Sequence, residues 1–159
     1  MRVRDVMRTP VVTVAPDATL REAARAMARH TVGYLVVASD GTVRGVVTDR
    51  DLAVRGLGAE RSATAPVRDV ATAPVRDVMT EQVHSVAPDD DVDAAYRTMR
   101  RASVRRLPVL DAGRLVGVVA LDDLLMDVSR RLSELLGAVS WCVLAEPPGD
   151  EFSQVGRGS

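Results

Sequence analysis

Few side chains in this sequence have the types and spacing that covalent chemistry requires. His30, His84 and Cys142 are isolated from one another, whereas a structural zinc site needs about four such ligands at close spacing. Adjacent carboxylates occur at residues 89–91 and 122–123, but such neighbours more often cap helices or face solvent than form an acid–base pair. No Ser/His/Asp set, nucleophile elbow or GxGxxG motif is present. We therefore expect neither a metal site nor a catalytic centre.

Composition and charge exclude several further classes. The 159 residues carry a net charge of −1, from 21 basic and 22 acidic side chains, which gives no electrostatic reason to expect a nucleic-acid partner. All the basic residues are arginine, so a lysine Schiff base and a Walker-type phosphate loop are excluded. No signal peptide or 18-residue apolar run is found. We expect a cytoplasmic protein without a membrane anchor, and the single cysteine fits a reducing compartment.

The chain repeats itself at an offset of 72 residues. VRDVM occurs at residues 3–7 and again at 75–79, and the alignment continues without a gap. Residues 3–54 match their counterparts at 23 of 52 positions, which chance does not produce. The chain is therefore two copies of one unit.

Each repeat is expected to fold in the order β, α, β, β, α. Leu20, Ala23, Ala24 and Met27 recur at helical spacing after two candidate N-caps, Asp17 and Thr19. The other predictions for the first repeat are strands at 11–14, 35–38 and 43–48 and a helix from Asp49, its cap, to 55. For the second repeat they are a helix at 92–101, strands at 107–110 and 115–119, and a longer helix from 121 to about 136.

These elements predict an α/β (α+β) fold. The strands are nearly all apolar, which indicates cover on both faces, and a lone unit of about 55 residues leaves one sheet face open. We expect the two repeats to pack about a pseudo-twofold axis and two chains to form a homodimer. The predicted parts are a first repeat at 1–58, a linker at 59–74, a second repeat at 75–136 and a tail at 137–159 with a disordered end.

One stretch within the linker is doubled. The octapeptide ATAPVRDV occurs at residues 63–70 and again, unchanged, at 71–78. Only the second copy runs into Met79 and keeps the 72-residue register, so the first is interpreted as a spacer. The alternative is that residues 67–70 compete with 75–78 for one groove.

The order of VRDVM, VTVAPD, a helix, a strand, a turn and GVVTDRDL resembles the cystathionine-β-synthase (CBS) domain. Two copies in tandem resemble the Bateman module, in the short stand-alone form common in actinobacteria. The resemblance covers residues 3 to about 136. It implies a non-catalytic sensor that binds an adenosine-containing ligand (AMP, ADP, ATP or S-adenosylmethionine) between its repeats, needs no cofactor, and signals to a separate, unknown effector protein.

The resemblance also implies roles for individual residues. In the family, a pattern G-apolar-apolar-[ST]-x-x-D holds the ribose. GVVTDRD matches it fully at residues 45–51, which makes Thr48 and Asp51 candidates. GVVALDD retains Asp123 but places Ala120 where the hydroxyl belongs, so the second ribose position is expected to be weaker or empty.

The family's adenine and phosphate contacts fall on two other segments. The adenine segment maps onto Thr9, Pro10 and Val11 in the first repeat and onto Glu81, Gln82 and Val83 in the second. The phosphate contacts map onto Arg105 and Arg106, whose counterparts Gly33 and Tyr34 carry no charge. Whether the two arginines serve a nucleotide bound at Asp51 or at Asp123 stays open.

A second interpretation is an interaction scaffold that dimerises around a vestigial pocket. Ala120 and the uncharged Gly33-Tyr34 pair favour it. Apolar residues at Leu132, Leu135 and Leu136 and beyond, around Trp141, suggest an interface that a lone CBS pair does not need.

Overall fold

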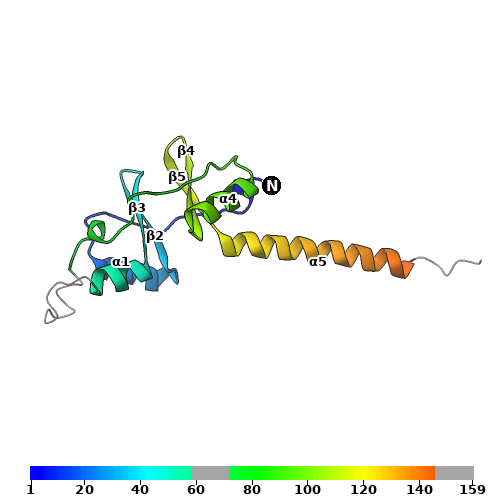
Figure 1. Cartoon of the computed structure of the whole chain (residues 1–159), viewed down its shortest axis with the longest axis horizontal. Helices are drawn as coiled ribbons and strands as arrows, with labels where there is room; N and C mark the ends of the chain where they lie inside the picture. Colours follow the sequence, from blue (N-terminus) through cyan, green and yellow to red (C-terminus); the bar gives the residue numbers. More distant parts are fainter. Residues whose placement is uncertain (59–71, 146–159) are drawn as a thin grey trace, which may run out of the picture. The chain divides into compact units, whose positions relative to one another are not determined.

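The computed structural model describes residues 1–58 and 72–145 and divides into two compact units. The first unit, Met1–Leu124, ends after the first four residues of the last helix, and the second unit is Leu125–Ser159. Figure 1 labels the main elements. In chain order they are η1 (Val3–Asp5), β1 (Thr13–Val14), α1 (Leu20–His30), β2 (Tyr34–Ser39), β3 (Thr42–Thr48), α2 (Asp49–Asp51), η2 (Leu52–Leu57), η3 (Val75–Asp77), α4 (Val92–Ala102), β4 (Arg106–Asp111), β5 (Arg114–Ala120) and α5 (Leu121–Ala145).

The first repeat forms a three-stranded sheet. Strand β1 runs parallel to β2, which pairs antiparallel with β3. The β2–β3 turn uses Asp40 and Gly41 at φ values of 52° and 76°, a left-handed conformation that glycine and aspartate tolerate best. Both hairpin strands predicted from the valine-rich pattern are confirmed.

Helix α1 packs on this sheet through the predicted apolar face. Leu20, Ala23 and Met27 are buried. Of the two candidate N-caps, Thr19 serves: its hydroxyl accepts a hydrogen bond from the Glu22 N–H at 3.2 Å, and the Glu22 carboxylate accepts one from the Thr19 N–H at 2.7 Å. This reciprocal capping box sets the first residue of the helix.

The second repeat departs from the prediction at its first strand. Its sheet contains only β4 and β5, and the expected first strand is reduced to an isolated parallel bridge between Val86 and Val109. In the first repeat the Val36 N–H donates to the Val12 carbonyl at 3.3 Å. Pro108 stands at the position equivalent to Val36 and has no N–H to donate, so the ladder stops after one bridge.

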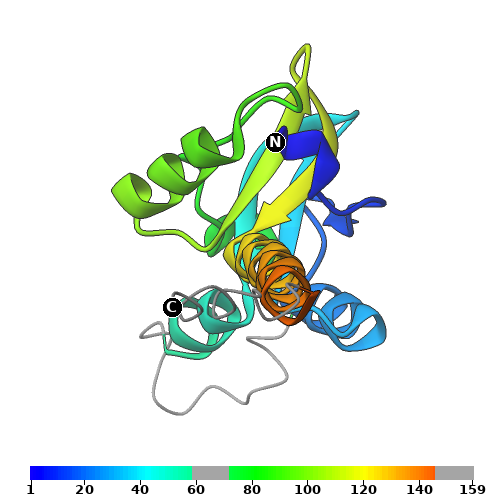
Figure 2. The same ribbon diagram turned by 90° about the vertical axis from the view of Figure 1, so that its right-hand side faces the viewer.

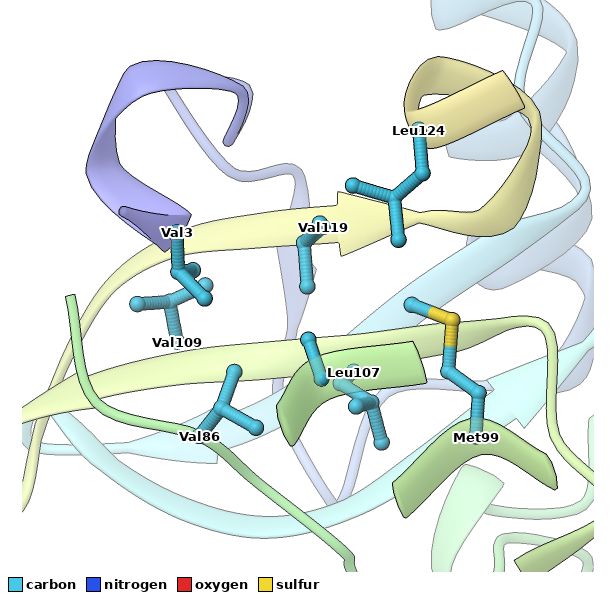
Figure 3. Packing of buried hydrophobic residues seen from close by; sticks show 8 residues of the cluster. Val3, Val86, Met99, Leu107, Val109, Val119 and Leu124 are labelled. Carbon is cyan, nitrogen blue, oxygen red and sulfur yellow. The ribbon is translucent and has the colours of Figure 1, made fainter. Parts of the chain in front are cut away.

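The two VRDVM segments (residues 3–7 and 75–79) are exchanged between the repeats. Val3 N–H donates to Asp90 O at 2.9 Å in the second repeat, and Val75 N–H donates to Ala18 O at 2.8 Å in the first. Figure 2 shows the N-terminal segment in dark blue beside the second repeat's strands. Figure 3 shows Val3 within the second repeat's core, next to Val109 and near Val119. Each repeat is therefore completed by the start of the other.

A methionine at the end of each VRDVM segment packs on a strand glycine of the repeat that receives it. A Cβ added to Gly117 would lie 2.6 Å from the Met7 sulfur, and one added to Gly45 would lie 2.8 Å from the Met79 sulfur. A larger residue would force Met7 to move from Gly117, and at Gly45 it would also meet the Thr80 carbonyl oxygen, 2.9 Å from the added Cβ.

Two helix predictions need correction. The helix after β3 is capped by Thr48 rather than Asp49, since the Thr48 hydroxyl accepts from the Asp51 N–H at 3.1 Å, and the helix continues as the π-helical η2. Helix α5 continues past residue 136 to Ala145: it passes through Gly137, which lowers helix propensity, and meets no proline before Pro147. The first octapeptide copy at 63–70 and the predicted disordered end lie outside the described residues.

Candidate functional site

A first cavity of about 350 Å³ lies between the repeats, within the size range of small-molecule sites. Both repeats contribute to its wall, because the end of β3, the start of β4 and the residues that directly follow the second VRDVM segment converge there. The side chains that bear on binding are Thr48, Asp51, Thr80, Val83, Arg105 and Arg106.

Asp51 is held in this cavity with one carboxylate oxygen occupied. Its Oδ2 accepts hydrogen bonds from the Thr48 N–H at 3.0 Å and the Thr48 hydroxyl at 2.8 Å. Its Oδ1 lies 3.6 Å from Arg55 Nε, which is beyond hydrogen-bond distance. The cap therefore orients the carboxylate and leaves Oδ1 able to accept from a ligand hydroxyl.

Arg55 links the Asp51 helix to the exchanged segment. Its Nη1 donates to the Val78 carbonyl at 3.1 Å and to the Thr80 hydroxyl at 3.3 Å. Together with the Asp51 contact, these bonds hold Thr80 beside the carboxylate. The position of Thr80 thus depends on both repeats.

Tyr34 and Arg106 stand between the first cavity and a second one. The Arg106 guanidinium carbon lies 5.9 Å from the centre of the Tyr34 ring, within cation–π range. The Tyr34 hydroxyl is buried and has no hydrogen-bond partner among the described residues. Burial raises the pKa of this hydroxyl above its ordinary value, and the Arg106 charge partly opposes the rise. A buried donor of this kind favours a ligand that brings an acceptor.

The second cavity, of about 320 Å³, is related to the first by the repeat but differs in its polar groups. Pro10, Val11, Ala120 and Asp123 line it, and Tyr34 and Arg106 form a wall common to both cavities. Ala120 takes the place of Thr48, so the second cavity lacks the hydroxyl that holds Asp51 in the first.

Arg8 holds the carboxylate of the second cavity instead. Arg8 Nε donates to Asp123 Oδ1 at 2.9 Å and to Oδ2 at 2.8 Å, and Nη2 also donates to Oδ1. These hydrogen bonds raise the pKa of Arg8 further above its ordinary value. Asp123 is only 16% exposed, and Arg8 bonds both of its oxygens.

The residues that the sequence singled out divide between the two cavities. The first cavity brings together Thr48, Asp51, Gln82, Val83, Arg105 and Arg106, and the second brings together Pro10, Val11, Asp123 and Arg106. Thr9 and Glu81, at equivalent positions, line neither cavity. Arg105 thus shares a cavity with Asp51, and Arg106 lines both.

Sequence reasoning missed Arg8, Thr80 and Arg55. Arg8 and Thr80 are equivalent positions that differ directly after the identical VRDVM segments, and this difference was the available signal. The sequence difference between Arg8 and Thr80 could be interpreted only once each VRDVM segment was known to pack on the opposite repeat.

Two further observations concern metals and membranes. Within residues 1–58 and 72–145, no three His, Cys, Asp or Glu side chains lie together as a metal site would require. Across the same residues, no helix combines the length and the apolar character needed to span a bilayer.

Comparison with known proteins places the chain in a family. The CBS domain model matches residues 3–57 and 75–130. The chain is 41% identical over 122 residues to the CBS domain-containing protein YhcV of Bacillus subtilis, covering 77% of this chain and 81% of YhcV. It is 31% identical over 133 residues to hypoxic response protein 1 of Mycobacterium tuberculosis, covering 82% and 85%.

Solved structures agree in fold. Hypoxic response protein 1, crystallised with two coordinated zinc ions, has a TM-score of 0.68 at 29% identity, covering 79% of this chain and 98% of that one. A CBS-domain protein of Agrobacterium tumefaciens has a TM-score of 0.68 at 29% identity, covering 80% and 98%. A CBS domain pair in complex with 5′-methylthioadenosine and S-adenosyl-L-methionine has a TM-score of 0.67 at 24% identity, covering 87% and 97%. The chain belongs to the CBS domain family and carries two such domains in tandem.

Proposed function

We propose that this protein is a non-catalytic regulatory module that binds an adenosine-containing ligand in the first cavity and signals to a separate partner protein. AMP, ADP, ATP and S-adenosylmethionine are the candidate ligands. The observation that carries the proposal is the pairing, in one cavity, of an oriented carboxylate at Asp51 with the guanidinium groups of Arg105 and Arg106.

This pairing suits the two ends of a nucleotide. The open Oδ1 of Asp51 is able to accept from a ribose hydroxyl, and the arginines suit a phosphate, which guanidinium binds through paired N–H groups. Gln82 and Val83 provide a polar and an apolar wall where an adenine ring would lie. The CBS pair crystallised with two adenosine derivatives shares the fold, and the same ligand class is extended to this chain on the strength of these side chains.

Thermal unfolding with a panel of AMP, ADP, ATP, NADH and S-adenosylmethionine tests the proposal. A ligand present at 100 times its dissociation constant should stabilise the protein by about 2.7 kcal/mol. Asp51→Ala should abolish the shift. If no ligand shifts the melting temperature of the wild type, the proposal is wrong.

Asp51→Ala also removes a capping box, so it needs a matched control. Glu22→Ala removes the equivalent box at the start of α1, away from both cavities. Both variants should lose about 1 kcal/mol of stability without ligand. Only Asp51→Ala should lose the ligand-induced shift; an unchanged shift in this variant would rule out its role at the ribose.

The second candidate function is a ligand-free interaction scaffold. Ala120 and the ion-paired Asp123 favour it, because the second cavity lacks a free carboxylate. A scaffold would show no ligand shift and would still bind its partner. The thermal panel therefore separates the two functions.

Dimerisation is the structural part of the proposal. Leu125, Val128, Leu132 and Leu135 lie on one face of α5, and each is more than half exposed. We propose that a second copy of the chain covers this face. A monomeric mass in light scattering at micromolar concentrations would contradict this. Leu132→Glu should shift the average molecular mass in solution from that of a dimer toward that of a monomer.

A further inference from the structure

Arg8 and Thr80 occupy equivalent places in the two repeats and are fixed by equivalent backbone bonds. Arg8 N–H donates to Val118 O at 2.8 Å, and Val118 N–H donates back to Arg8 O at 3.1 Å. The corresponding bonds between Thr80 and Val46 measure 2.9 and 3.0 Å. The backbones of Arg8 and Thr80 are therefore placed equivalently relative to the two cavities, and the two positions differ in the side chain that they carry.

The two cavities differ at a second pair of equivalent positions, where the first cavity has Thr48 and the second has Ala120. In the first cavity, the Thr48 hydroxyl bonds one oxygen of Asp51, and the other oxygen faces Arg55 at 3.6 Å, beyond hydrogen-bond distance; Thr80, the equivalent of Arg8, is neutral. In the second cavity, Ala120 offers no hydroxyl, and Arg8 bonds both oxygens of Asp123. A carboxylate has about four lone-pair sites, and at Asp123 the guanidinium of Arg8 takes sites on both oxygens, so a ligand hydroxyl has to compete with it.

We infer that Arg8 is a specificity-determining residue: by bonding both oxygens of Asp123 it excludes a ribose from the second cavity, so the chain binds one nucleoside ligand rather than two. The inference rests on the proposed function of the first cavity. A ribose at Asp123 has to replace charge-assisted guanidinium bonds by bonds from neutral hydroxyls, which are about half as strong.

The ion pair between Arg8 and Asp123 contributes little to the stability of the fold. The Arg8 side chain is 79% exposed, and pairs with so exposed a partner contribute little to stability. The backbone bonds to Val118 hold the segment in place whatever the side chain is. Restoring the first cavity's residues, by Arg8→Thr with Ala120→Thr, should therefore create a second ribose position without unfolding the protein.

Four proteins test the inference by calorimetric titration with AMP: the wild type, Asp51→Ala, the Arg8→Thr/Ala120→Thr variant, and the variant with all three substitutions. The expected numbers of sites per chain are one, none, two and one.

The outcomes separate the inference from the proposed function. A wild type that binds no AMP excludes AMP as the ligand of the first cavity, binding none of the panel ligands contradicts the proposed function, and in either case the inference then stands or falls on the triple variant alone. The inference is overturned if the triple variant binds no AMP, or if the wild type already binds two.

Arg4→Thr is the matched control. Arg4 lies in the same segment, forms an exposed ion pair with Asp89 of the second repeat, and lines neither cavity. Introduced with Ala120→Thr in the Asp51→Ala background, it should create no site. A site in this control would assign the gain to Ala120→Thr and overturn the role of Arg8.

Discussion

The Arg106 guanidinium lies 5.9 Å from the centre of the Tyr34 ring, and these two residues are 72 positions apart, so they are equivalents in the two repeats. The pseudo-twofold relation between the repeats thus brings a cation and an aromatic ring together where two identical residues would otherwise meet. Both residues line both cavities. A single arginine therefore faces two cavities, and one ligand phosphate is sufficient to engage it.

Arg106→Ala should weaken AMP binding tenfold or more. A charge-assisted hydrogen bond contributes about 1.5–3 kcal/mol, and adenosine, which has no phosphate, should lose much less affinity. Calorimetric titration with both ligands measures the difference. Arg101→Ala, an exposed arginine of α4, is the control and should change neither affinity. Equal losses for AMP and adenosine would argue against a phosphate contact.

Tyr34→Phe should leave the unliganded protein as stable as the wild type or stabilise it by about 1 kcal/mol. The hydroxyl is buried without a partner in the described part of the chain, and removing such a group relieves its desolvation penalty. Urea unfolding at pH 8 measures the change. A loss of more than about 1 kcal/mol would mean that the hydroxyl has a stabilising partner.

The same tyrosine should make stability depend on pH above about 10. Burial raises the pKa of Tyr34, so the folded protein keeps a proton that the unfolded chain releases above the ordinary tyrosine pKa. Its contribution is complete below about pH 10 and falls above that by up to about 1.4 kcal/mol per pH unit. Tyr34→Phe should flatten the profile between pH 9 and 11, whereas Tyr96→Phe, at a 48% exposed residue, should keep the wild-type profile.

Val3→Ala should destabilise the second repeat, and Val75→Ala should destabilise the first, because each valine is buried in the core of the other repeat. Both side chains are fully buried, and losing two methyl groups from a core costs about 2 kcal/mol. Hydrogen exchange should show that Val3→Ala reduces protection in α4, β4 and β5, and that Val75→Ala reduces protection in α1, β2 and β3. The reverse pattern would contradict the exchange of the VRDVM segments.

Deleting residues 63–70 should leave both folding and ligand binding intact. The copy that remains supplies Val75 and Val78, which are buried in the first repeat's core, and a shorter linker changes closure entropy only slightly. Unfolding free energy should stay within about 0.5 kcal/mol of the wild type. A loss of dimer mass or solubility would show that the first copy has acquired a role.

Spacing along the chain was sufficient for most of the fold. The apolar period of α1 and α4, the valine-rich strands and the turn at Asp40-Gly41 depend on residues within a few positions of one another, so they could be predicted. The missing first strand of the second repeat could not, because it depends on the absence of an N–H at Pro108, far along the chain from the strand it would have paired with.

The candidate site, too, could be predicted only in part. The resemblance to the CBS family was sufficient to single out Asp51, Asp123 and the two arginines as candidates, because each falls within a short stretch of sequence. The tertiary fold was needed to place Arg105 with Asp51, and to join Arg8 to Asp123 across 115 residues of sequence. The physical reason is the exchange of the VRDVM segments: each cavity is completed by residues of the opposite repeat, and no pattern within one repeat records which partner it will receive.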